Sequence, residues 1–352
     1  MMITVPSFAK INLGLCIGPL RADGFHELRT VYQTIALHDL IRVSVERGSG
    51  VEIQCDDPRV PRDSTNTCWR IVERTMEALK ARGRVVIEIQ KRLPVQGGLG
   101  GASGNAVAAL LGLERALKKR LSGPERLRVT AEVGSDLPLF LVGGTVLGVG
   151  RGEEVYPLPD FQAMACLIAL PEVAVSTPKA FADWDGLAGR SSAWTGKNAR
   201  PHTNRGDANI AVRSKLTVPA QSDRMLEFGR EISAWLNAGP VATKPRRSGV
   251  SARDGGRAEN PLLDLVRTGI ENDFEKVVFP KHPELCEVKR VLERWGAVYA
   301  SLSGSGAAVY GLFESKMRAD SAAKKLEKSG TRAVVTSTLT RRQYWKKLLA
   351  IS

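Results

Sequence analysis

A glycine-rich segment, residues 93–105, has the composition of a loop that binds phosphate. It lies between a strand-like run and a run, residues 103–119, whose apolar side chains recur at helical spacing. Glycine lets successive backbone N–H groups turn toward one point, and the N-terminus of the following helix adds its positive dipole end. Pro94 at its start and Leu99 in its middle argue against a flexible connector, which is the alternative. No Lys-Ser or Lys-Thr pair closes the loop and it does not read G-x-G-x-x-G, so we predict a phosphate site of another type.

Two polar side chains, Lys10 and Asn12, lie among apolar neighbours in the strand-like stretch of residues 3–17. An edge-strand or snorkelling lysine would also explain Lys10, so its role stays open on these residues alone. Asp136 is likewise enclosed by apolar residues and a proline. A buried carboxylate costs free energy unless it is paired or hydrogen-bonded. Asp136 is therefore predicted to be either a structural cap after a helix or a functional base.

A turn with an aromatic ring and an imidazole follows the first strand. Residues 21–26 read Arg-Ala-Asp-Gly-Phe-His, in which Asp-Gly marks the turn and Phe25 and His26 follow at once. A histidine in such a place is more often structural when it is considered alone.

The composition is that of a globular enzyme with two domains. A length of 352 residues exceeds what one hydrophobic core usually supports. The net charge of +14 fits nucleic acid, an anionic surface or a polyanionic small substrate, and does not choose among them. Five cysteines without C-x-x-C spacing indicate neither a zinc site nor a disulfide framework. The N-terminus lacks the pattern of a signal peptide and the apolar runs are too short to span a bilayer, so we expect a cytoplasmic protein.

Periodicity predicts a mixed α+β domain in the first half, with separate strands at residues 31–35 and 39–45. Between residues 166 and 338 the second half reads strand, helix, two strands, helix, strand, which is a split βαβ, ferredoxin-like pattern. Two stretches rich in Gly, Ser, Arg, Asn and Pro are predicted to be loops or linkers, with a possible helix at 225–236 between them; they are residues 189–221 and 240–260. The basic segment 341–347 is interpreted as a surface segment.

Three separated motifs resemble those of the GHMP kinases, the small-molecule kinases that include galactokinase, homoserine kinase and mevalonate kinase. They are Ser-Phe-Ala-Lys-Ile-Asn-Leu at residues 7–13, the loop at residues 94–105, and Ser-Leu-Ser-Gly-Ser-Gly at residues 301–306. The resemblance implies an α+β fold of two domains. Residues 1–160 would form a ribosomal-protein-like N-terminal domain with the ATP phosphate loop. Residues 161–352 would form a ferredoxin-like C-terminal domain with a loop or linker insertion at about 189–260.

The resemblance also implies roles for individual residues. Lys10 and Asp136 match the family's catalytic pair, in which a base acts on the attacking hydroxyl and a positive charge lies beside the γ-phosphoryl oxygens. The residues implied to bind ATP are Asn66, Lys91, Pro94, Val95, Gln96, Gly97, Gly98, Leu99, Gly100, Gly101, Ala102, Ser103 and Gly104. Those implied to bind the acceptor substrate are Asn12, Phe25, His26 and Phe181. The implied metal is Mg²⁺ shared by the ATP phosphates, and no protein ligand is assigned to it.

Within the family, the motifs are most similar to the branch that phosphorylates the 2-hydroxyl of a cytidine diphosphate-linked methylerythritol, on the non-mevalonate route to isoprenoid precursors. Residues 21–26, 135–140 and 272–275 carry this similarity. The family usually has serine at the position of Gly104 and tyrosine at that of Phe25. A phosphate or metal contact and one hydroxyl are therefore expected to be lost here.

Three other functions are weighed against this one. Another GHMP kinase, of the homoserine or mevalonate type, is the nearest alternative, and a homoserine kinase would lack the turn at residues 21–26. A basic nucleic-acid-binding protein on a related fold is the second, but the basic residues are not interleaved with aromatic ones on one element. A catalytically silent regulator would have lost Lys10 or Asp136, and both are present. We therefore expect a small-molecule partner, with neither nucleic acid nor membrane, and assign no oligomeric state.

Overall fold

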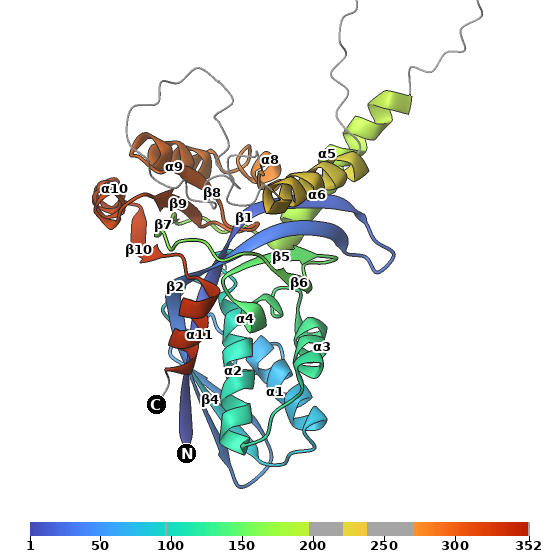
Figure 1. Cartoon of the computed structure of the whole chain (residues 1–352), viewed down its shortest axis with the longest axis vertical. Coiled ribbons are helices and arrows are strands. Elements are labelled where there is room, and N and C mark those ends of the chain that lie inside the picture. Colours follow the sequence, from blue (N-terminus) through green and yellow to red (C-terminus); the bar gives the residue numbers. More distant parts are fainter. Residues whose placement is uncertain (96, 197–220, 238–269, 351–352) are drawn as a thin grey trace, which may run out of the picture.

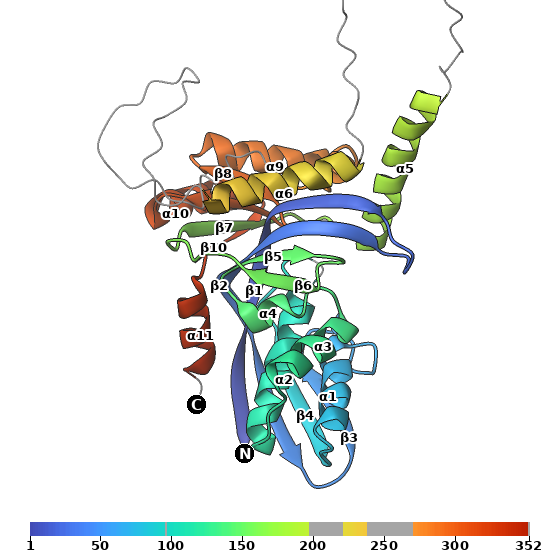
Figure 2. The same ribbon diagram turned by 45° about the vertical axis from the view of Figure 1, so that its right-hand side comes forward.

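A long antiparallel hairpin, β1 (Met2–Leu20) with β2 (His26–Glu46), runs through the whole molecule (Figures 1 and 2). The computed structural model describes residues 1–95, 97–196, 221–237 and 270–350. The prediction of two separate strands in the second arm of this hairpin was wrong. The arm stays continuous because a bulge absorbs two residues: Phe8 pairs with His38, and the next residue, Ala9, pairs with Ile35.

The hairpin is the centre of the first sheet. The strand order is β3 (Gly50–Cys55), β4 (Arg84–Gln90), β2, β5 (Thr145–Val149) and β6 (Glu154–Pro157), and β1 pairs with β2 outside this path. The helices of this half are α1 (Thr67–Ala78), α2 (Gly101–Leu117), α3 (Gly123–Val133) and α4 (Leu139–Val142). Helices α1 and α2 lie along the sheet (Figure 2) and share a core with its strands. Helix α2 is buried over most of its length, which fits its run of Ala, Val and Leu.

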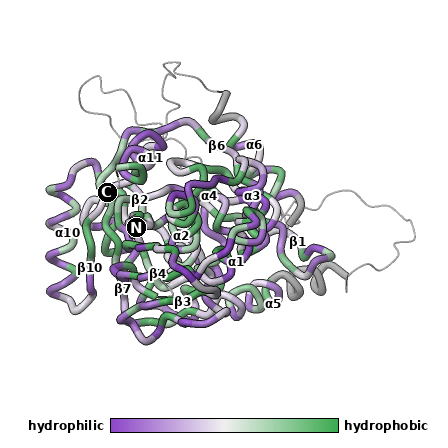
Figure 3. Tube along the Cα trace, turned by 90° about the horizontal axis from the view of Figure 1, so that it is seen from below, coloured by the Kyte–Doolittle hydropathy of each residue, from purple (hydrophilic) through white to green (hydrophobic). Residues whose placement is uncertain are grey.

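The second sheet has the order β10 (Arg332–Ser337), β7 (Ala165–Leu170), β9 (Val309–Phe313) and β8 (Tyr299–Leu302), and all its pairs are antiparallel. Helices α9 (Pro283–Arg294) and α10 (Lys316–Lys328) pack on it. The predicted ferredoxin-like arrangement is confirmed. Helix α10 lies at the edge of the molecule and is largely hydrophilic (Figure 3), and the side chains that it buries are Ala319, Ala322, Ala323 and Leu326.

Two helices occupy parts of the region predicted as loops. Helix α5 (Thr177–Gly196) extends beyond residue 189, so residues 189–196 are helical where a loop was predicted. Helix α6 (Gln221–Asn237) confirms the possible helix at residues 225–236. Residues 197–220 and 238–269, which include the rest of the predicted insertion, lie outside the described residues.

Residues 341–347 lie at the surface as predicted, with Arg342, Gln343, Lys346 and Lys347 exposed, but they form a helix with one buried side. Thr340 caps helix α11 (Arg341–Leu349), and Tyr344 and Leu348, one turn apart, are both buried. The Tyr344 hydroxyl donates a hydrogen bond to the Phe140 carbonyl at 2.7 Å, and its ring lies 5.3 Å from the ring of Phe8 on β1. Helix α11 therefore supports the first half of the chain.

The two halves are joined at the middle of β1. The Tyr310 hydroxyl of β9 donates to the Asn12 carbonyl, and the Tyr299 hydroxyl of β8 donates to the Leu13 carbonyl, both at 2.7 Å. Asp273, fully buried, accepts from the Ile17 amide at 2.9 Å and pairs with Arg224 of α6 and Lys276. No helix in the described part of the chain has the length and apolar composition needed to cross a bilayer.

Asp273→Ala is expected to lower the free energy of unfolding by about 2 to 3 kcal/mol, because the Ile17 amide and the partly buried Arg224 lose their acceptor. Urea denaturation measures this loss. Lys316→Ala is the control, because it breaks an exposed ion pair with Asp320 and should leave stability nearly unchanged. Equal midpoints for the two variants would contradict the assignment of Asp273 as a junction between the halves.

Candidate active site

The glycine-rich loop takes a backbone conformation that only glycine adopts without strain. Gly98 and Gly100 have φ angles of +72° and +69°. A Cβ on Gly98 would lie 2.0 Å from the Ser303 carbonyl oxygen, and one on Gly100 would lie 2.9 Å from Cγ of Lys10. The loop is therefore pressed between the Ser303 turn of the second half and the side chain of Lys10.

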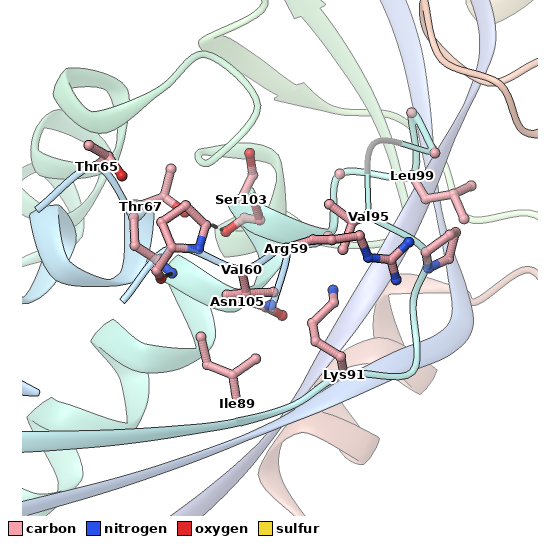
Figure 4. A pocket seen from close by; sticks show the side chains of 18 residues that line it. Arg59, Val60, Thr65, Thr67, Ile89, Lys91, Val95, Leu99, Ser103 and Asn105 are labelled. Carbon is pink, nitrogen blue, oxygen red and sulfur yellow. Dashed lines mark hydrogen bonds between the residues drawn. The ribbon is translucent and has the colours of Figure 1, made fainter. Parts of the chain in front are cut away.

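A pocket of about 360 Å³ lies between this loop, the start of α1 and β4 (Figure 4). Eleven of the predicted ATP-binding residues line it: Asn66, Lys91, Pro94, Val95, Gly97, Gly98, Leu99, Gly100, Gly101, Ala102 and Ser103. The other lining residues, outside the predicted ATP-binding set, are Arg59, Val60, Pro61, Thr65, Thr67, Ile89 and Asn105. Gln96 lies outside the described residues.

Lys91 is held at the wall of this pocket by a buried carboxylate. Its Nζ lies 2.5 Å from Oδ2 of Asp39, which is fully buried. The other oxygen of Asp39 accepts from the backbone amides of Arg92 and Leu93, at 2.6 and 2.7 Å. Asp39 thus fixes both the lysine and the start of the loop. Its signal in the sequence is an aspartate within an apolar strand.

Asn66 contributes to the pocket as the cap of α1. Its Oδ1 accepts from the Cys68 amide at 2.8 Å, and its Nδ2 donates to the Pro61 carbonyl at 2.6 Å. Both ends of the side chain are therefore already used by the protein.

Gly104 does not line the pocket, in contrast to the prediction. A Cβ there would lie 2.8 Å from the Phe8 carbonyl oxygen and 2.9 Å from Ser7 Oγ. Its amide already donates to the Gly100 carbonyl at 2.8 Å. A side chain at this position would meet β1, so glycine here allows a close approach of α2 to β1.

Lys10 and Asp136 come together at the edge of the loop. Nζ of Lys10 lies 3.5 Å from Oδ2 of Asp136 and donates to Oδ1 of Asn12 at 2.6 Å. The backbone amide of Lys10 donates to the Leu99 carbonyl at 2.9 Å. Burial lowers the pKa of the Lys10 ammonium, and the Asp136 carboxylate opposes this shift. Lys10 is thus not a snorkelling surface lysine.

Asp136 is not a helix cap, because its two oxygens meet side chains. Oδ1 accepts from the Tyr32 hydroxyl at 3.0 Å, while Oδ2 faces Lys10. Its side chain is 35% exposed, so the expectation of a buried carboxylate was wrong. A carboxylate held on one side and open to solvent on the other is able to accept a proton from a bound molecule.

The predicted acceptor residues fall into three places. Asn12 is buried beside Lys10, and its Nδ2 donates to Thr30 Oγ1 at 2.8 Å. His26 stacks on Phe181, with ring centroids 5.2 Å apart and planes at 6°. Phe25 is 51% exposed, and the Arg151 guanidinium lies 4.9 Å above its ring.

His26 is held between two acceptors. Its Nδ1 lies 3.1 Å from the Gly18 carbonyl oxygen, and its Nε2 lies 3.2 Å from Oδ1 of Asp185 on α5. The imidazole is thus fixed in place and stacked on an aromatic ring at the far end of the hairpin from Lys10.

Residues 272–275 connect the surroundings of Lys10 with the His26–Phe181 pair. The sequence did not reveal this connection. Nδ2 of Asn272 donates to the carbonyls of Leu302 and Gly304, at 2.9 and 2.8 Å. Phe274 contacts Phe181 edge to face, with centroids 4.9 Å apart. The segment therefore holds both the turn beside Lys10 and the ring that stacks on His26.

The glycine-rich loop lies beside Lys10 and the partly exposed carboxylate of Asp136. An enzyme that transfers a phosphoryl group to a small molecule needs these three features: a phosphate-binding loop, a positive charge and a base. The sequence matches the family descriptions "GHMP kinases N terminal domain" over residues 66–144 and "GHMP kinases C terminal" over residues 258–332. The chain belongs to the GHMP kinases, whose phosphoryl donor is ATP.

Similar proteins extend over nearly the whole chain. The 4-diphosphocytidyl-2-C-methyl-D-erythritol kinase of Solibacter usitatus is 33% identical over 347 residues, which cover 98% of this chain and 92% of that protein. The kinase of the same name from Acaryochloris marina is 32% identical, over 92% of this chain and 91% of that protein.

Two solved structures have the same TM-score of 0.63. One is a 4-(cytidine 5'-diphospho)-2C-methyl-D-erythritol kinase, 26% identical, with 95% of this chain and 98% of that chain covered. The other is a homoserine kinase from Cytophaga hutchinsonii, 20% identical, with 96% and 95% covered. Similarity of fold alone therefore does not separate these two activities.

Gly104→Ser is expected to lower the free energy of unfolding by about 1 to 3 kcal/mol without tightening ATP binding, because the added Cβ meets the backbone of β1. Thermal or urea denaturation and an ATP titration measure the two effects. Gly123→Ser is the matched control, since Gly123 has open space around its Cβ position. Tighter ATP binding at unchanged stability would contradict the orientation described for Gly104.

Proposed function

We propose that the chain catalyses ATP-dependent phosphorylation of the 2-hydroxyl of 4-(cytidine 5'-diphospho)-2-C-methyl-D-erythritol. The observation that carries the proposal is the Lys10–Asp136 pair beside the glycine-rich loop, with Gly100 against the stem of Lys10. Two relatives of that name, alike over more than nine tenths of the chain, support the choice of substrate.

The proposed reaction uses these groups in one in-line step. Asp136 accepts the proton of the acceptor hydroxyl, and the hydroxyl oxygen attacks the γ-phosphorus of ATP. The bond between that phosphorus and the oxygen bridging to the β-phosphate breaks, which leaves ADP and a phosphate monoester. The Lys10 ammonium offsets the negative charge of the phosphoryl oxygens during transfer.

Mg²⁺ fits this site as a companion of the nucleotide. The described residues contain no group of three or more His, Cys, Asp or Glu side chains able to hold a metal ion by themselves. Mg²⁺ commonly keeps several waters and is held by one or two protein oxygens together with substrate phosphates. Ser103 in the pocket wall offers such an oxygen here. When bound, the ion would neutralise charge on the transferred phosphoryl group.

The length of the site favours a nucleotide-linked acceptor over an amino acid. Along β2, Tyr32, which contacts Asp136, lies six positions after His26, which stacks on Phe181. At the usual rise of a strand this is about 20 Å. An extended substrate with a base at one end is able to reach both places, whereas homoserine is not.

We also propose that the enzyme is cytoplasmic. Free thiols at all five cysteines support a reducing compartment.

A coupled assay of ADP release tests the substrate. We expect turnover with the cytidyl substrate and ATP, and values of kcat/KM at least about 100-fold lower with homoserine or mevalonate, because neither fills the His26–Phe181 end. Phosphorus NMR of the product identifies the esterified hydroxyl. Preferential turnover of homoserine or mevalonate would overturn the proposal.

Asp136→Asn is expected to lower kcat by about 10²- to 10⁴-fold, because the amide keeps the shape of the carboxylate but does not accept the proton. ATP binding should stay within a few-fold of the wild type, since Asp136 does not line the nucleotide pocket. Asp320→Asn, in an exposed ion pair, is the control. Turnover at the wild-type rate in Asp136→Asn would remove Asp136 from the role of base.

A further inference from the structure

The turn between β5 and β6 lies beside the middle of the proposed acceptor site. The Gly150 carbonyl accepts a hydrogen bond from the Leu28 amide of β2 at 2.6 Å. A Cβ on Gly152 would lie 2.5 Å from the Tyr32 hydroxyl. The turn therefore runs along β2 between these two residues of the strand, and Arg151 is at its centre.

The side chain of Arg151 is held by its own turn and by an aromatic ring. Its backbone amide donates to Oε2 of Glu153 at 2.6 Å, and its Nε donates to Oε1 of the same carboxylate at 3.2 Å. Its guanidinium carbon lies 4.9 Å from the centroid of the Phe25 ring. Within the described part of the chain, the terminal nitrogens Nη1 and Nη2 make no hydrogen bond. The side chain is 27% exposed, so a bound molecule is able to reach it.

The acceptor that we propose carries a diphosphate between its cytidine and its methylerythritol. This group has to lie between the two ends of the site if the base reaches His26 and the reacting hydroxyl reaches Asp136. An anion that leaves water needs an opposite charge and hydrogen-bond donors in return. A guanidinium supplies both, because its planar N–H groups match the oxygens of a phosphate. Arg151 lies where such a group is needed.

We propose that Arg151 binds the diphosphate of the acceptor substrate through Nη1 and Nη2. This assignment depends on the proposed function, because it assumes an acceptor linked to cytidine diphosphate. Glu153 positions the guanidinium through Nε, and the Phe25 ring supports it by a cation–π contact. Asp23, another carboxylate near Arg151, is paired with Arg21 at 3.3 Å. Arg151 thus favours a nucleotide-linked acceptor without taking part in the transfer itself.

Arg151→Met removes the charge and the donors and keeps an unbranched side chain beside Phe25. We expect the KM for the cytidyl substrate to rise about 10- to 100-fold, the effect of losing hydrogen bonds to a charged group. The value of kcat should change little, because an interaction made equally before and during transfer affects KM alone. The KM for ATP should also stay unchanged, because Arg151 does not line the nucleotide pocket.

Arg318→Met is the matched control. It removes the same charge from an exposed ion pair with Glu314 on α10, and it should change neither KM nor kcat.

Competition by fragments of the substrate identifies the group that Arg151 binds. Cytidine and CDP share the base and the ribose, and only CDP carries the diphosphate. Both are measured against the cytidyl substrate with ATP saturating. In Arg151→Met the inhibition constant of CDP should rise as much as the KM, and that of cytidine should not change. If both constants rise alike, Arg151 acts by holding the Phe25 ring, and if neither rises, it does not bind the substrate; either result overturns the proposal.

Two further measurements cover the remaining outcomes. If Arg151→Met does not fold, Arg151→Lys keeps the charge and loses the paired donors, so the inhibition constant of CDP alone should rise several-fold; an unchanged constant overturns the proposal. Failure of the proposed function has a different sign, because the wild type would then not turn over the cytidyl substrate, which overturns both. Turnover by the wild type together with an unchanged CDP constant in Arg151→Met overturns the role of Arg151 alone.

Discussion

The site depends on the burial of one ammonium group. An ion removed from water loses solvation worth several kcal/mol, so the Lys10 side chain needs partners. Asn12 accepts its hydrogen bond, and Asp136 supplies the opposite charge. Gly100 provides space for the lysine, because a Cβ there would lie 2.9 Å from Cγ of Lys10. On the other side Gly304 lies next to the ammonium, and a Cβ there would come to 3.4 Å from Nζ, an ordinary contact. The position of the Lys10 ammonium and the backbone conformation of the glycine-rich loop therefore depend on one another.

The partners of Lys10 are held in turn by segments far along the chain. Tyr310 of the second half fixes the Asn12 carbonyl, and Asn272 fixes the turn that contains Gly304. The Ser303 hydroxyl donates to the Gly98 carbonyl at 3.0 Å, which joins that turn to the loop. The second half thus fixes groups that surround the Lys10–Asp136 pair. The predicted domain boundary near residue 160 therefore does not separate the groups around Lys10, because residues on both sides of it contribute to them.

The sequence predicts what depends on local pattern and leaves out what depends on long-range contact. The glycine-rich loop could be predicted from its composition. Lys10 and Asp136 could be predicted because they are polar residues among apolar neighbours. The contact of Tyr32 with Asp136 spans 104 residues and that of Lys91 with Asp39 spans 52, so no local signal reports either. The orientation of Gly104 toward β1 likewise follows from packing. Helix α11 was missed because its buried face consists of two residues in a basic segment.

The contact between the rings of Tyr344 and Phe8 has a consequence for folding during synthesis. The first strand leaves the ribosome 336 residues before the tyrosine that covers it, because the contact joins residues 8 and 344. At ~5 to 20 residues per second the strand waits roughly 20 to 70 seconds for this neighbour. During that interval Phe8 has no cover from Tyr344 and the apolar surface around it is available to chaperones. The hydrophobic core of the first half therefore stays incomplete at Phe8 until helix α11 has been synthesised.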